Sequence, residues 1–149
     1  AKGDQYEQFA GAAGIAGARK NILASRCVYV ADSYEEALED LRPAVAYETS
    51  IQAERGFLKV IKKLLNLDVP NDERAIDVLA GAGLYLLGEP DRIAGQIRDL
   101  YEASGGFGTF LIVSGKDWAS SEKRARSMTR FMEEVAPQLR HLEPEDAAG

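Results

Sequence analysis

Two kinds of hydrophobic pattern alternate along this sequence. Three short runs, over residues 27–31, 84–87 and 109–113, are apolar at nearly every position. Such runs are typical of strands that are buried on both faces. Between them, apolar residues recur every three or four positions, which predicts amphipathic helices. The pattern therefore predicts a helix-rich α/β fold with a parallel sheet.

The expected helices are bounded by local end signals. Ser33 and Glu36 have the spacing of a capping box, and Pro90 suits a first helical turn. Pro43 should end the second helix. Asp117 can cap the last helix, whose buried stripe would be Met128, Met132, Val135 and Leu139. The predicted helices cover residues 4–22, 34–41, 44–66, a short segment between 72 and 81, a segment from 90 to about 104, and the end of the chain.

Composition narrows the class of protein. The 149 residues suffice for one domain but fall short of the roughly 250 of a closed (β/α)8 barrel. The net charge is -6 and the basic residues form no stripe, so we expect no nucleic-acid partner. No apolar run approaches the roughly 20 residues that span a bilayer, so we expect no membrane partner and a cytoplasmic location.

Cysteine and histidine offer little chemistry. Cys27 is the single cysteine, so no intramolecular disulfide can form, and its apolar neighbours indicate a small core residue within a strand. His141 is the single histidine and lies close to an acidic tail over 143–149, which we expect to be flexible. We therefore predict no metal site and no histidine-based catalysis.

Several sequence motifs together resemble the C-terminal part of luciferase-like flavin-dependent monooxygenases, in the branch that includes limonene-monooxygenase-like proteins. They are GEPDRIA (88–94), GGFGTFL (105–111), DWA (117–119) and the strand SRCVYVADS (25–33). The resemblance covers roughly residues 10–142. It departs from the family's pattern in the last helix, where Met128 replaces the usual tyrosine and Ala136, before Pro137, replaces the usual methionine, and it includes no counterpart of the first half of the barrel.

The resemblance implies a partial (β/α)8 TIM barrel over residues 1–142, made of its last strand and helix units. It also implies that the parent protein uses reduced flavin, with FMN as the expected cofactor, and dioxygen in a monooxygenase reaction. Because the missing half supplies most flavin contacts in that family, we expect the chain alone to be inactive and to bind FMN weakly or not at all. The alternative is a truncated, non-catalytic module that acts through homo-oligomerisation or subunit assembly.

In a TIM barrel, chemistry lies at the carboxyl ends of the strands. That rule selects Gly88, Glu89 and Ser114 as candidate cofactor-binding residues and Trp118 as a candidate substrate-pocket residue. Each also has a structural explanation: Gly88 suits a tight turn, and Trp118 can anchor the last helix. The helix that begins at Pro90 offers free N–H groups to an anion, but its acidic neighbours disfavour phosphate. The sequence identifies no catalytic residue.

A partial barrel leaves sheet edges uncovered. We expect the strand at 27–31 or at 109–113 to lack a neighbour on at least one side. A partner chain that pairs edge to edge, a swapped helix such as 44–66, or the missing N-terminal half of the barrel could cover it. Because most soluble oligomers have two-fold symmetry, we expect a homodimer. Its interface would be a strand edge or the apolar stripe of Phe57, Val60, Ile61 and Leu64.

Overall fold

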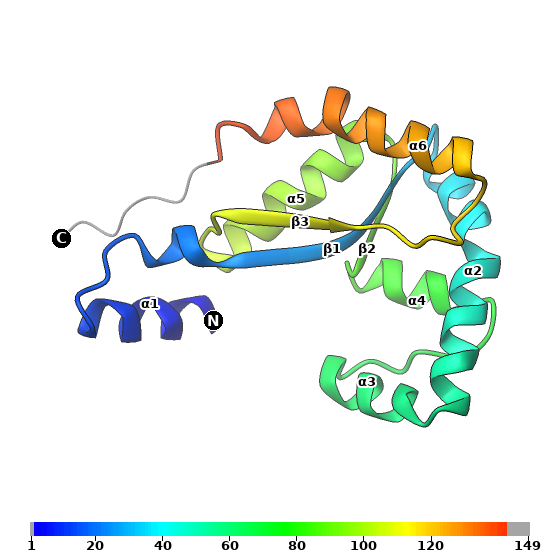
Figure 1. The fold of residues 1–149 in the computed structure, drawn as a ribbon, viewed down its shortest axis with the longest axis horizontal. Coiled ribbons are helices and arrows are strands. Elements are labelled where there is room, and N and C mark those ends of the chain that lie inside the picture. The colour runs from blue at the N-terminus through cyan, green and yellow to red at the C-terminus, as the bar shows by residue number, and fades with distance from the viewer. Residues whose placement is uncertain (1, 143–149) are drawn as a thin grey trace.

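The computed structural model describes residues 2–142, and its centre is a parallel sheet (Figure 1). The sheet consists of β1 (Leu23–Val30), β2 (Tyr85–Gly88) and β3 (Thr109–Val113). All three predicted strands are therefore confirmed, although β1 begins at residue 23 and not at 27. The helix-rich α/β class and the parallel sheet predicted from the sequence are confirmed as well.

The first strand lies at the centre of this sheet, whose order is β2-β1-β3. β2 runs beside the second half of β1, with Val30 opposite Gly88. β3 runs beside the first half, with Leu23 opposite Thr109. Within residues 2–142, β3 pairs with β1 alone, so its outer edge is open, as predicted for the strand at 109–113. In the strand at 27–31, Cys27 has a strand neighbour on each side, whereas, within the described part of the chain, residues 28–30 pair with β2 alone.

Helices cover both faces of the sheet (Figure 1). One face packs against α2, α3 and α4, and the other packs against α5 and the π turn that extends α6. No helix among the described residues is long and apolar enough to cross a membrane. The helices are α1 (Lys2–Ala12), α2 (Tyr34–Glu54), α3 (Phe57–Leu65), α4 (Ala75–Gly81), α5 (Pro90–Ser104) and α6 (Ser121–Arg130), followed by a π turn (Phe131–Val135) and a 3-10 turn (Ala136–Leu139); a further 3-10 turn (Ala18–Asn21) precedes β1.

The two faces of β1 each contribute to one hydrophobic cluster. Successive side chains of a strand point to opposite faces, so Tyr29 and Ala31 belong to one cluster and Val28 and Val30 to the other. We call them the α2 cluster and the α5 cluster. All four of these side chains are buried. The continuous apolar run predicted for this strand thus reflects burial on both sides.

The long helices differ from the prediction at Pro43. The sequence predicted a break there, but α2 continues through it from Tyr34 to Glu54. Proline removes one backbone hydrogen bond, and burial of Leu41 and Val45 on either side offsets that loss. The break occurs instead at Gly56, whose φ of 75° lies in the left-handed region. The predicted helix over 44–66 is therefore wrong, and its second part is the separate helix α3.

Both ends of the chain also need correction. The helix predicted over 4–22 ends at Ala12, because Gly14 and Gly17 adopt positive φ values of 73° and 66°. At the other end, Ser120 and not Asp117 caps α6, by accepting a hydrogen bond from the Lys123 N–H at 3.2 Å.

The buried stripe of the last helix also differs from the prediction. Val135 is buried and Leu139 is partly buried, as predicted, but Met128 and Met132 are 40% and 60% exposed, and Ser127 and Phe131 are buried in their place. The π turn changes the helical register, so the buried residues follow one another at steps of four. The acidic tail predicted over 143–149 lies outside the described residues.

Candidate functional site

The predicted cofactor residues follow two different strands and do not converge. Gly88 ends β2 at the level of Val30, while Ser114 follows β3, which ends opposite Cys27. Because β1 lies between them, the two positions are separated by two strand spacings, roughly 9–10 Å. Gly88 is buried, whereas Glu89 and Ser114 are exposed. The structure therefore keeps Gly88 and Glu89 together and places Ser114 apart from them.

Gly88 has a close neighbour that explains the residue type. Its φ is 109°, and a Cβ built at this position would lie 3.1 Å from the Tyr34 Cα. The Gly88 carbonyl also accepts a hydrogen bond from the Ala31 N–H at 2.9 Å. Glycine is thus required for the close approach of β2 to the start of α2.

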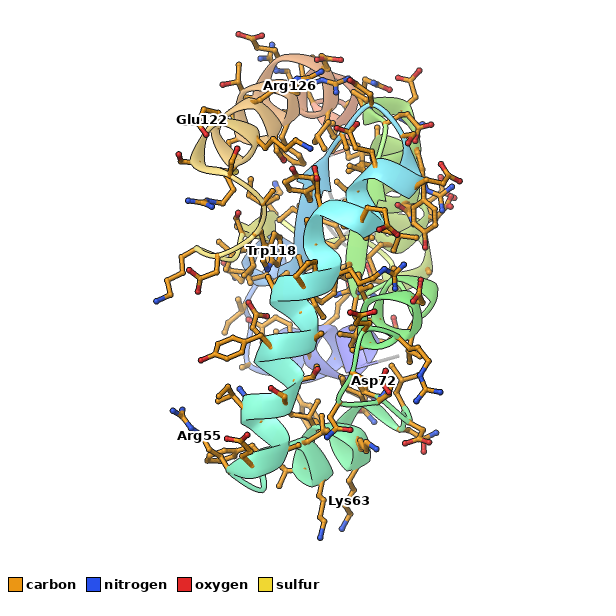
Figure 2. The ribbon with its side chains drawn as sticks, turned by 90° about the vertical axis from the view of Figure 1, so that its right-hand side faces the viewer. Arg55, Lys63, Asp72, Trp118, Glu122 and Arg126 are labelled. Carbon is orange, nitrogen blue, oxygen red and sulfur yellow. The ribbon has the colours of Figure 1, made fainter. Side chains whose placement is uncertain are left out.

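Trp118 is buried between the loop after β3 and the α2 cluster (Figure 2). It is 1% exposed, and its ring centroid lies 5.5 Å from that of Tyr85. The loop is fixed further because the Arg124 guanidinium donates to the carbonyls of Trp118 and Ala119, both at 3.0 Å. A side chain at Gly115 would overlap the indole ring. In this chain Trp118 holds the loop against the sheet.

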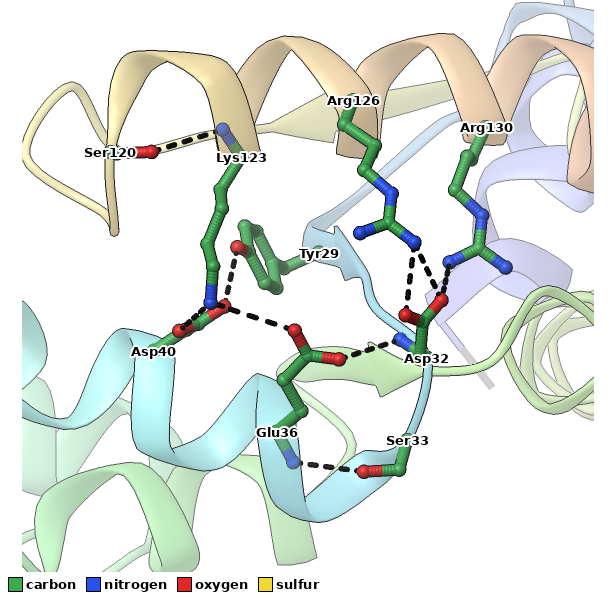
Figure 3. A network of polar contacts seen from close by, with 9 residues as sticks. All are labelled: Tyr29, Asp32, Ser33, Glu36, Asp40, Ser120, Lys123, Arg126 and Arg130. Carbon is green, nitrogen blue, oxygen red and sulfur yellow. Dashed lines mark hydrogen bonds and ion pairs between the residues drawn. The ribbon is translucent and has the colours of Figure 1, made fainter.

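A polar network joins α6 to the carboxyl end of β1 (Figure 3). The Asp32 carboxylate follows β1 and pairs with Arg126 and Arg130 of α6, each at 2.8 Å. The two arginines are four residues apart and therefore share one face of the helix. They hold the pKa of Asp32 below its ordinary value, the hydrogen bond from Arg126 being the largest cause.

A second part of the network is centred on Asp40 of α2 (Figure 3). Its carboxylate accepts a hydrogen bond from the Tyr29 hydroxyl at 2.8 Å and pairs with the Lys123 ammonium at 2.7 Å. Burial, followed by the bond to Asp40, raises the pKa of Tyr29 well above its ordinary value. At the start of α2, Ser33 Oγ accepts from the Glu36 N–H at 3.0 Å, which confirms the predicted cap. The Glu36 carboxylate accepts from the Asp32 N–H.

Acidic side chains flank the strand end that precedes α5. The start of α5 offers free N–H groups, but exposed Glu89 and Asp91 stand beside them, and like charges repel a phosphate. Arg92 lies with its guanidinium carbon 4.3 Å from the Tyr34 ring centroid. Arg126 and Arg130 of α6 are paired with Asp32. Residues 2–142 also contain no group of three His, Cys, Asp or Glu side chains that could hold a metal ion.

Sequence reasoning identified the Ser33 and Glu36 cap but missed the ion pairs of the network, and it also missed a second polar group farther along α2. The spacing of Arg126 and Arg130 indicated a shared basic face, but nothing in the sequence identified Asp32 as its partner. Glu48 and Tyr85 line a cavity beneath α3. Because a helix break was predicted at Pro43, Glu48 was assigned to a separate helix, and its position beside the buried residues of α2 was not recognised.

Comparison with known proteins assigns the chain to a family. The family described as luciferase-like monooxygenase matches residues 1–106, well over half of the sequence. The chain belongs to the luciferase-like monooxygenase family. This confirms the resemblance that the motifs at 25–33 and 88–94 indicated, and the matched region includes Gly88 and Glu89.

Two curated members of the luciferase-like family are similar in sequence. Limonene 1,2-monooxygenase of Rhodococcus erythropolis is 33% identical over 118 residues, which cover 76% of this chain and 27% of that protein. 4-hydroxyprotoasukamycin monooxygenase of Streptomyces nodosus subsp. asukaensis is 34% identical over 113 residues, which cover 75% of this chain and 29% of that protein. The chain thus spans less than a third of the length of these relatives.

A solved structure agrees with this partial correspondence. The oxygenating constituent of 3,6-diketocamphane monooxygenase from the CAM plasmid of Pseudomonas putida, a type II Baeyer-Villiger monooxygenase solved in complex with FMN, superposes with a TM-score of 0.67 at 25% identity. The superposition covers 91% of this chain but 38% of that chain. Nearly all of the fold described above therefore has a counterpart in part of a larger FMN-binding relative.

Proposed function

We propose that this chain is the C-terminal barrel segment of a flavin-dependent monooxygenase that uses reduced FMN and dioxygen. The observation that carries the proposal is the superposition of 91% of the chain onto part of an FMN-complexed monooxygenase, together with the family match over residues 1–106. When bound, the flavin supplies the oxygen chemistry. In this proposal the segment supplies a wall of the enzyme and does not hold the flavin alone.

The geometry of the segment supports a wall role. Its charged groups at the strand ends neutralise one another, as Asp32 does with Arg126 and Arg130. Trp118 is packed into the α2 cluster rather than open at a rim. Because these polar groups already bond to one another, they favour a rigid surface that positions other parts of the enzyme.

A chimera tests the proposal. The segment of Rhodococcus erythropolis limonene 1,2-monooxygenase that aligns with this chain is replaced by the chain itself. We expect the purified chimera to bind FMN and to form an oxygenated limonene product when reduced FMN and dioxygen are supplied. A chimera whose near-ultraviolet circular dichroism shows a folded protein, but which binds no FMN, would contradict the proposal.

One test variant and one control variant of the chimera show whether the loop after β3 affects FMN binding. In a Trp118→Ala chimera the loop after β3 loses its anchor, so FMN affinity should fall although the flavin is not touched directly. A Lys116→Ala chimera changes an exposed residue of the same loop, whose side chain is 91% exposed, and should behave like the parent chimera. Equal FMN affinity in all three proteins would show that the segment plays no part in shaping the flavin site.

The chain alone should behave differently. Because Glu89 and Asp91 flank the start of α5 and two arginines of α6 are paired with Asp32, we expect weak FMN binding or none. A fluorescence titration of free FMN with the chain checks this expectation. Sub-micromolar affinity with a shifted flavin spectrum would show that the chain holds a complete cofactor site.

A second candidate function is a non-catalytic module that acts through homo-oligomerisation. The observation that favours it is the exposure of Phe57, Val60 and Leu64 on α3, at 57%, 62% and 79%. The open edge of β3 is a second uncovered feature. Ile61, which the sequence placed in the same stripe, turns toward the cavity beneath α3 and is partly buried. The proposed interface is therefore these three exposed residues of α3 or the β3 edge.

A further inference from the structure

A cavity of about 340 Å³ lies between the sheet and the helices α2, α3 and α4. Its floor includes Cys27 of β1 and Tyr85 of β2, and its walls include Glu48 of α2 and Ile61 of α3. Cys27 lies opposite Tyr85, three residues before the paired ends Val30 and Gly88. The cavity is thus separate from the strand ends that carry the Asp32 network.

The walls of the cavity are largely aliphatic. Helix α3 contributes Leu58, Ile61 and Leu65, and α4 contributes Leu79. Pockets that bind small molecules are mostly apolar, have volumes from about 300 Å³ upward, and carry a few polar groups that orient the ligand. This cavity has the size and the wall composition of a site for a compact ligand.

Glu48 is the acidic residue that lines the cavity. It is partly buried, and no lysine or arginine among residues 2–142 forms an ion pair with it. Burial raises the pKa of Glu48, Asp117 raises it further, and the Trp118 indole N–H offsets part of this rise. The indole N–H itself makes no hydrogen bond of good geometry in the described structure. The wall therefore carries a carboxyl group that forms no ion pair with a lysine or arginine among residues 2–142, although the Arg26 side chain lines the same cavity.

Two other polar side chains of the cavity, Thr49 and Arg26, make hydrogen bonds within the protein. The Thr49 hydroxyl donates to the carbonyls of its own helix, at 2.9 Å to Val45. The Arg26 guanidinium donates to the Gly83 carbonyl at 2.8 Å and to the Ser25 carbonyl at 2.7 Å. A cationic ligand would thus find one carboxylate, that of Glu48, among the residues that line the cavity with Tyr85.

We propose that this cavity binds a compact apolar amine, with the ammonium group against Glu48 and the hydrocarbon body among Leu58, Leu65 and Leu79. An ammonium group forms a charge-assisted hydrogen bond with a carboxylate and is attracted to an aromatic face such as that of Tyr85. This site lies outside the strand ends and goes beyond the proposed role as a barrel wall.

Two probes of nearly equal shape test the proposal. 1-Aminoadamantane is a cation at pH 7, and 1-adamantanol is its neutral counterpart. Binding to the full chain is measured by calorimetry and by the fluorescence of Trp118, the single tryptophan, whose ring packs on Tyr85. We expect the amine to bind at least tenfold more tightly than the alcohol. Added salt should weaken the binding of the amine and leave that of the alcohol nearly unchanged.

Three variants of the chain test which residues cause the preference for the amine. Glu48→Gln keeps the size of the side chain and removes its charge, so the preference for the amine should disappear while the alcohol still binds. Glu54→Gln removes an exposed carboxylate at the end of the same helix and should preserve the preference. Leu65→Trp fills the cavity from its partly exposed rim and should weaken both probes.

Several results of these measurements would overturn the proposal. Equal affinities of the two probes for the unmodified chain, or no binding of either at millimolar concentration, overturn the proposal. A preference for the amine that survives Glu48→Gln overturns it as well. The salt dependence measured on the unmodified chain decides the case if the Glu48→Gln chain does not fold. None of these outcomes depends on flavin binding, so the proposed monooxygenase role is tested separately.

Discussion

The Ser127 hydroxyl accepts a hydrogen bond from the backbone N–H of Val30 at 2.8 Å, and both residues are buried. Val30 is the last residue of the central strand, so its N–H faces α6 at the point where the strand ends. One side chain of the last helix thus completes the hydrogen bonding of the first strand. The two elements are far apart in sequence, and this bond ties them in space.

Replacing Ser127 with alanine should destabilise the fold. The substitution leaves the Val30 N–H buried without a partner, which costs about 1–3 kcal/mol. Urea unfolding followed by circular dichroism measures the change. Thr129→Ala, at an exposed position of the same helix, serves as the control and should change stability by less than about 0.5 kcal/mol. Equal effects of the two substitutions would contradict a structural role for the Ser127 bond.

Stability should fall as the solution becomes strongly alkaline. Burial raises the pKa values of Tyr29 and Tyr85 above the roughly 10 of an unfolded tyrosine. The folded state therefore favours the neutral phenols, and their contribution is complete below about pH 10 and declines as the pH rises above it. Unfolding free energies at pH 8, 10 and 11 should show this decline. Tyr29→Phe and Tyr85→Phe should each reduce the slope, whereas Tyr47→Phe, at a site 64% exposed, should not.

Gly88 should resist substitution more strongly than a helical glycine. An alanine Cβ at this position meets the Tyr34 backbone at 3.1–3.2 Å while φ is 109°, so we expect a loss of about 1–3 kcal/mol. Gly11→Ala is the matched control, because nothing lies within 4 Å of its built Cβ and it belongs to α1. That substitution should stabilise by about 0.5–1 kcal/mol. Thermal unfolding of the two variants gives the comparison, and a neutral Gly88→Ala would be evidence against the close approach.

A charge on α3 should disrupt association if the exposed stripe forms the interface. Leu64 is 79% exposed, so Leu64→Asp should leave the fold intact while it releases monomers from a dimer. Sedimentation velocity at tens of micromolar measures this change. Phe9→Asp, at a site 75% exposed on α1, is the control and should leave the dimer unchanged. A stable monomer for the unmodified chain would reject the oligomeric module.

The strands and their burial could be predicted from local sequence, but their order could not. The run around Val28 and Val30 is apolar at successive positions because both faces are covered, and that property depends on the strand alone. Strand order depends on long-range pairing, such as Leu23 with Thr109, which leaves no local signature. The continuation of α2 through Pro43 was missed for a similar reason, since burial of Leu41 and Val45 outweighs the local cost of proline.

The candidate site was predicted less completely than the fold. The rule that chemistry follows the strands selected Gly88 and Ser114, and the structure separates them because β2 and β3 lie on opposite sides of β1. The family resemblance was predicted from short motifs, which can be recognised in the sequence without knowledge of the fold. Whether Glu48 forms an ion pair depends on which cations lie near it after folding. That information is three-dimensional and could not be obtained from spacing along the chain.

The central position of β1 has a consequence for biosynthesis. Ribosomes extend a chain by roughly 5–20 residues per second, so β1 emerges seconds before the segments that become its neighbours. Its second half must wait for Tyr85–Gly88, and its first half must wait for Thr109–Val113. Throughout this interval the nascent chain carries an apolar strand with two unpaired edges, the kind of segment that chaperones shield from aggregation. The yield of folded protein should therefore depend on how quickly the last quarter of the chain follows the first.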